Sequence, residues 1–90
     1  MLHYQVAYHL PKPGERMVVA EVLDFPGVMS QGFDLADARQ MIASALEEMA
    51  ELYLEQGRAL PVPGTVPVED ASADLIERMP LSIEVAAARP

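Results

Sequence analysis

Carboxylates are the side chains of this sequence most able to do chemistry, since fourteen Asp and Glu residues stand against six Lys and Arg. A metal-dependent nuclease needs three or four carboxylates converging on paired metal ions about 4 Å apart. Two of the strands predicted below, residues 2–10 and 28–33, contain no carboxylate. Glu21 and Asp24 lie near the end of a third. The pattern therefore argues against metal-dependent nuclease chemistry.

The other candidates for chemistry are two histidines and a serine. His3 and His9 are six residues apart on one predicted strand, or roughly 20 Å, which is too far to share a metal ion. Ser30 lacks the G-x-S-x-G elbow of a nucleophile, and the glycines do not form a phosphate-binding loop. The sequence contains no Cys. We therefore expect no catalytic residue, no metal site, no cofactor and no enzymatic activity.

The charge balance indicates the kind of partner. The net charge is −8 and the isoelectric point is near 4.4. Such a surface repels phosphate backbones, so direct nucleic-acid binding by this chain is disfavoured, and it attracts basic proteins. An acidic surface also keeps a small protein soluble, and this simpler explanation stays open.

Three short strands are predicted in the first third of the sequence, at residues 2–10, 16–23 and 28–33, from alternating polarity and β-branched residues. Turn residues separate them, so the strands should form an antiparallel meander. Gly27 and Gly32 bracket the third strand, and we expect both to adopt positive φ.

A long helix is the strongest local prediction. Asp34 is placed as its N-cap, and Asp37 as the reciprocal capping residue. Gly57 is placed to end it, so the helix spans about 22 residues, or about 33 Å. One apolar stripe runs along it at spacings of three to four residues: Leu35, Ala38, Met41, Ile42, Ala45, Leu46, Met49, Leu52 and Tyr53. The opposite face carries glutamates.

The last third of the sequence holds weaker signals. Three prolines in residues 61–67 predict an extended return path. Residues 72–79 predict a short helical turn stopped by Pro80, and residues 86–90 a frayed tail. Alternation over 81–85 predicts the final strand, with inward positions Leu81, Ile83 and Val85.

Together these elements predict a single α+β domain over residues 1–90, with the order β-β-β-α-β. The last strand should lie beside the first, giving sheet order 3-2-1-4 with the helix on one face. The other face is left to loops, solvent or a second copy, so a homo-oligomer, dimer or tetramer, is expected. Four apolar residues are candidates for that contact: Met17, Val19, Leu23 and Met29.

The sequence also predicts a soluble, cytoplasmic protein. No apolar run approaches the roughly 20 residues that span a bilayer, so no membrane association is expected. The first residues, 1–6, do not show the basic and then apolar pattern of a signal peptide.

Several segments together resemble the HicB-like antitoxin family, whose members carry a D-x-P-G-x-x-S-Q-G segment, an acidic helix start and an x-P-x-P exit after the helix. The resemblance covers roughly residues 2–63. Two departures are Asp34, where threonine is usual, and Ala36 in the usual acidic pair. The matching pieces are Tyr4-Gln5-Val6, Val18-Val19-Ala20-Glu21-Val22, Asp24-Phe25-Pro26-Gly27-Val28, Ser30-Gln31-Gly32, Leu35-Ala36-Asp37-Ala38 and Leu60-Pro61-Val62-Pro63.

The resemblance implies a degraded, partial ribonuclease H-like domain without nuclease activity. It also implies a small, basic, mRNA-cleaving HicA-like toxin as the partner, whose active surface the antitoxin covers. Family members that repress their own operon carry an added C-terminal DNA-binding segment, and none is recognised before Pro90. Binding of nucleic acid by this chain alone is therefore not expected.

Two regions are predicted to contact the partner. One is the turn formed by Asp24, Phe25, Pro26 and Gly27, and the other is the acidic helix face formed by Glu47, Glu48, Glu51 and Glu55. Alternatively, the P-G-V-M-S-Q-G stretch is a fold signature and the helix face is merely solvated. The alternative function is a solitary homo-oligomeric structural or regulatory module without a toxin.

Overall fold

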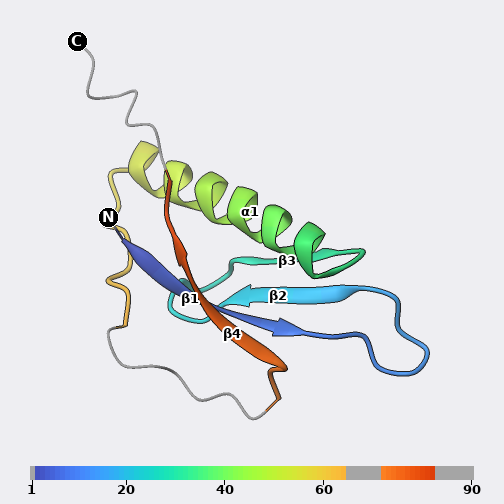
Figure 1. The fold of residues 1–90 in the computed structure, drawn as a ribbon. Coiled ribbons are helices and arrows are strands. Elements are labelled where there is room, and N and C mark those ends of the chain that lie inside the picture. The colour runs from blue at the N-terminus through green and yellow to red at the C-terminus, as the bar shows by residue number, and fades with distance from the viewer. Residues whose placement is uncertain (1, 65–71, 83–90) are drawn as a thin grey trace.

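A four-stranded antiparallel sheet with one helix across one face forms the fold (Figure 1). The computed structural model describes residues 2–64 and 72–82. The strand order is β3-β2-β1-β4, which confirms the predicted α+β architecture and sheet order. The elements are β1 (His3–His9), β2 (Val18–Val22), β3 (Met29–Gly32), α1 (Leu35–Glu55) and β4 (Leu75–Pro80).

The hydrophobic core lies between the sheet and α1. Alternate residues of β1 and β2 point toward the helix, as the period of two in a strand requires. The helix contributes buried residues at spacings of four, and it packs against β3 and β2. Core residues from these elements are Tyr4, Val6, Tyr8, Val18, Ala20, Val22, Ala38, Ile42, Leu46 and Ala50.

The two ends of α1 are set by local interactions. The Asp34 side chain accepts a hydrogen bond from the Asp37 N–H at 2.7 Å, which confirms Asp34 as the N-cap. The Asp37 carboxylate accepts from the N–H of Phe33 at 2.9 Å, so the reciprocal bond is made one residue before the cap. Gly57 follows the helix with φ +69°, as predicted. No helix in the described ranges combines the length and apolarity needed to cross a bilayer.

Gly27, in the turn before β3, and Gly32, the last residue of β3, have different roles. Gly27 adopts φ +87° in the turn before the strand, as expected. Gly32 does not adopt positive φ, so that prediction was wrong. Gly32 is buried, and a Cβ added there would lie 2.3 Å from the Ala38 backbone nitrogen. The glycine therefore permits β3 and α1 to approach each other closely.

The position of the last strand differs from the prediction. Residues 75–79 were expected in a helical turn that Pro80 stops, but residues 75–80 form β4 and pair with β1 from Tyr8↔Leu75 to His3↔Pro80. This long-range pairing supplies the backbone partners that favour a strand. Leu81 follows β4 and is buried, while Ile83, Val85, and residues 65–67 and 86–90 lie outside the described residues.

Candidate partner-binding surface

The acidic helix face occupies the second half of α1, turned away from the core. Glu48, Glu51 and Glu55 are exposed and Glu47 is half-buried, so the predicted outward orientation is confirmed. Within the part of the chain that the structure describes, none of these four carboxylates has a salt-bridge partner. They therefore present negative charge to solvent.

The positions of these glutamates work against the helix itself. They lie toward its C-terminal end, where the helix dipole is negative and favours cations. The pairs Glu47–Glu51 and Glu51–Glu55 are four residues apart, and each like-charged pair costs about 0.2–0.5 kcal/mol. Electrostatic interactions within the helix consequently do not explain this charge pattern.

The turn from Asp24 to Gly27 has an anchored part and an exposed tip. The Asp24 carboxylate accepts hydrogen bonds from the N–H groups of Gln5 at 2.9 Å and Gly64 at 3.0 Å. Phe25 is fully buried, with its ring centroid 5.4 Å from that of Tyr4. Pro26 and Gly27 are exposed. The first two residues thus fix the turn to the core, and the last two are accessible to a partner.

The exposed tip and the acidic helix face meet at one hollow. Gly27 and Glu48 both line this hollow of about 270 Å³, between the start of β3 and α1. The structure therefore brings together two regions that are 21 residues apart in the sequence (48 − 27). The other lining residues are Val28, Met29, Ala45, Met49 and Leu52.

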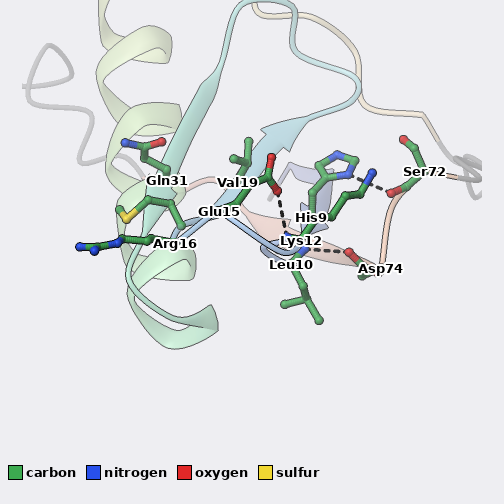
Figure 2. A pocket seen from close by; sticks show the side chains of 10 residues that line it. His9, Leu10, Lys12, Glu15, Arg16, Val19, Gln31, Ser72 and Asp74 are labelled. Carbon is green, nitrogen blue, oxygen red and sulfur yellow. Dashed lines mark hydrogen bonds between the residues drawn. The ribbon is translucent and has the colours of Figure 1, made fainter.

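A second hollow, of about 450 Å³, lies at the end of the β1–β2 hairpin and is shown in Figure 2. His9 lies there with Nε2 3.4 Å from the Glu21 carboxylate and Nδ1 3.1 Å from the Ser72 carbonyl oxygen. The Leu10 N–H donates to the Asp74 carboxylate at 2.7 Å. Within the described ranges, no three His, Cys, Asp or Glu residues are grouped to hold a metal ion. These contacts join the hairpin to the segment before β4.

A cluster of Tyr8, Arg39 and Glu77 was not anticipated from the sequence. The Arg39 guanidinium donates two hydrogen bonds to the Glu77 carboxylate, at 2.9 and 2.5 Å, and so joins α1 to β4. This contact lowers the pKa of Glu77 below its ordinary value. Burial, reinforced by the Glu77 charge, raises the pKa of Tyr8 to about 12. No local pattern signals an ion pair between residues 38 positions apart.

The fold is that of a known class of antitoxin domain. The N-terminal domain of the Burkholderia pseudomallei antitoxin HicB matches with a TM-score of 0.69 and 23% identity, over 90% of this chain and 99% of that one. A chain of a HicA3 and HicB3 toxin–antitoxin complex also matches with a TM-score of 0.69, at 17% identity, over 92% and 99%. No protein-family model matches the sequence, and no curated protein matches it significantly.

Proposed function

We propose that this chain is a non-catalytic, antitoxin-type protein that binds and neutralises a small, basic, HicA-like toxin in the cytoplasm. Its fold is shared with a HicB N-terminal domain and with a chain of a toxin–antitoxin complex. The toxin implied by the sequence resemblance cleaves mRNA, which places the encounter in the cytoplasm. The proposal requires no cofactor and no chemical step.

The observation that carries the proposal is the surface formed by the acidic helix face and the adjoining turn tip. Carboxylates with no salt-bridge partner in the described ranges attract a basic surface, and Gly27 and Glu48 line one hollow beside them. Exposed charges of this kind mainly increase the rate of association and the specificity for a basic partner. Side chains of the toxin would enter the hollow once the charges have oriented the two proteins.

Neutralisation on this proposal is steric and electrostatic. An RNA-cleaving protein needs a basic surface to hold its phosphate backbone substrate. Glu47, Glu48, Glu51 and Glu55 would compete with phosphates for the same cations. RNA would then be excluded for as long as the complex lasts.

Co-expression with a small basic HicA-like protein encoded beside the gene tests the proposal. We expect the two chains to co-elute in size-exclusion chromatography, and growth arrest by the toxin to be relieved. The complex should weaken as the salt concentration rises, because exposed charges are screened. Failure to co-elute at low salt, with growth arrest unrelieved, would contradict toxin binding.

A further inference from the structure

The free edge of β3 is exposed and apolar. Phe33 and Met29 are the most exposed large apolar residues of this region, at 81% and 61%. The segment from Val28 to Phe33 contains no ionisable residue and no proline. Natural edge strands usually carry charged residues or proline, because these residues discourage pairing with another chain.

The other edge of the sheet is different. β4 contains Glu77, Arg78 and Pro80, which are the residue types that protect an edge. The residues that the sequence predicts to form an oligomer contact are mostly less exposed than the β3 edge. Met17, Val19 and Leu23 are half-buried, and of that group Met29 alone is strongly exposed. The β3 edge is therefore the better candidate for contact with another chain.

Backbone groups on β3 point alternately toward β2 and toward solvent. The Val22 N–H donates to the Val28 carbonyl oxygen at 3.0 Å, so Val28 faces β2. The register Val18↔Gly32 to Glu21↔Met29 continues without a bulge. Antiparallel alternation then directs the backbone of Ser30 and Gly32 toward β2, and that of Met29 and Gln31 toward the free edge.

The free edge of β3 in one copy of the chain can pair with the same edge in a second copy. In an antiparallel pair of β3 strands with Gln31 opposite Gln31, the two residues exchange N–H···O=C bonds across a two-fold axis. The same register places Met29 of one copy opposite Phe33 of the other, on both sides of the axis. The Phe33 N–H is already bonded to Asp37, so the ladder would end there.

The side chains of Met29, Gln31 and Phe33 lie on the face of the sheet opposite α1. The alternate residues Ser30 and Gly32 pair with the core residues Ala20 and Val18, so they face the helix and their neighbours face away from it. The interface would therefore consist of the paired strands and these outward side chains, separate from the acidic helix face.

We propose that a second copy of this chain pairs with the β3 edge, forming a two-fold dimer with one continuous eight-stranded sheet. A basic partner would be attracted to the carboxylates on the outer face of α1. The β3 edge segment carries no charge, so a second copy of the chain fits this edge better than a basic partner does. Two chains of net charge −8 would approach each other most favourably through an uncharged strip. The dimer does not depend on toxin binding.

Sedimentation equilibrium of the full chain, with substitutions at Gln31, tests the dimer. Gln31→Glu and Gln31→Lys each place like charges opposite each other at the axis, so each should raise the dimer dissociation constant by about two- to fivefold. Mixing the two variants places opposite charges there and should restore the dimer. Gln40→Glu and Gln40→Lys are matched controls on the exposed face of α1, and neither should change the association.

A chain that remains monomeric at all concentrations would overturn the proposal. So would a dimer that is indifferent to both Gln31 variants, or variants that dissociate singly and stay monomeric when mixed. If the chain is monomeric and the Gln31 variants weaken toxin binding, the edge belongs to the toxin and the proposal fails.

Amide hydrogen exchange gives a second measurement that needs no variant. The amides of Ser30 and Gly32 should be protected at every protein concentration, because they bond to β2. The Gln31 amide should become protected only as the dimer forms. Equal exchange of the Gln31 amide in dilute and concentrated protein would exclude pairing along β3.

Discussion

The two edge strands of the sheet are attached to α1 by different forces. At β3, Gly32 lies so close to Ala38 that no side chain fits between strand and helix. At β4, the attachment runs through the side chains of Arg39 and Glu77, which are 43% and 32% exposed. The β3 contact depends on shape, whereas the β4 contact depends on charge and therefore on pH.

The solvent-facing edges of these strands also differ, because the edge of β4 is charged and the edge of β3 is not. The charged residues and the proline of β4 discourage another strand from pairing with it. β3 is held to the helix through backbone contact, so its side chains are free to serve another purpose. The comparison shows that an edge fixed by backbone packing can remain uncharged and available for assembly.

Among the substitutions at the two edges, Gly32→Ala should lower the free energy of unfolding the most. The added methyl group would collide with the Ala38 backbone and force β3 and α1 apart, at a cost of about 3 kcal/mol in the free energy of unfolding. Urea denaturation followed by circular dichroism measures this change. Gly14→Ala is the control, because Gly14 has φ +91° and open space around it, and should cost about 1 kcal/mol. Equal losses in the two variants would refute the close-packing explanation.

Arg39→Gln should have a moderate effect at the other edge. The pair is partly exposed, so its loss should cost about 1 kcal/mol at neutral pH. The folded-state pKa of Glu77 lies below its unfolded value, so the stabilisation is present above the unfolded value and disappears as pH falls through the folded one. Urea denaturation of both proteins from neutral to acidic pH should show the difference shrinking with acid.

The other carboxylates are common to both proteins, so the difference between them isolates the Arg39–Glu77 pair. A double-mutant cycle with Glu77→Gln sharpens the test, since residues in contact are not additive. Additive losses, or a difference independent of pH, would show that the pair does not hold β4 to the helix.

Tyr8→Phe should have the smallest effect at neutral pH, within about 0.5 kcal/mol, because the buried hydroxyl has no hydrogen-bond partner in the described ranges. In alkaline solution the stability of the unsubstituted chain and that of Tyr8→Phe should differ. Between the ordinary tyrosine pKa of 10.0 and the folded value of about 12, the unfolded chain binds fewer protons, so stability falls as pH rises. Unfolding measured over this range should show a smaller loss for Tyr8→Phe. Identical alkaline profiles would contradict the raised pKa.

The sequence predicts the first three strands and the helix well because their signals are local. The turn at Pro26–Gly27, the Asp34 cap and the helical spacing each act within a few residues. β4 was misplaced because its partners are distant. Glu77 lies on the helix side of the sheet because it pairs with the core residue Val6, and there it meets Arg39; no neighbouring residue in the sequence reveals either contact.

The same distinction applies to the candidate surface. Helical spacing alone predicts that Glu51 and Glu55 point outward. It does not predict that Phe25 enters the core, or that Asp24 bonds to Gly64, since both depend on chain segments brought together by folding. The shared hollow of Gly27 and Glu48 likewise exists only in the tertiary structure.

The central claim is that the acidic face of α1 binds a basic toxin, and calorimetric titration with a HicA-like toxin tests it most directly. Glu51→Lys and Glu15→Lys are matched variants, because both residues are exposed and both substitutions change the charge equally. We expect Glu51→Lys to weaken binding at least about tenfold and Glu15→Lys to leave it nearly unchanged. Equal affinities for both variants would place the toxin elsewhere, and no binding by the unsubstituted chain would contradict the proposed function.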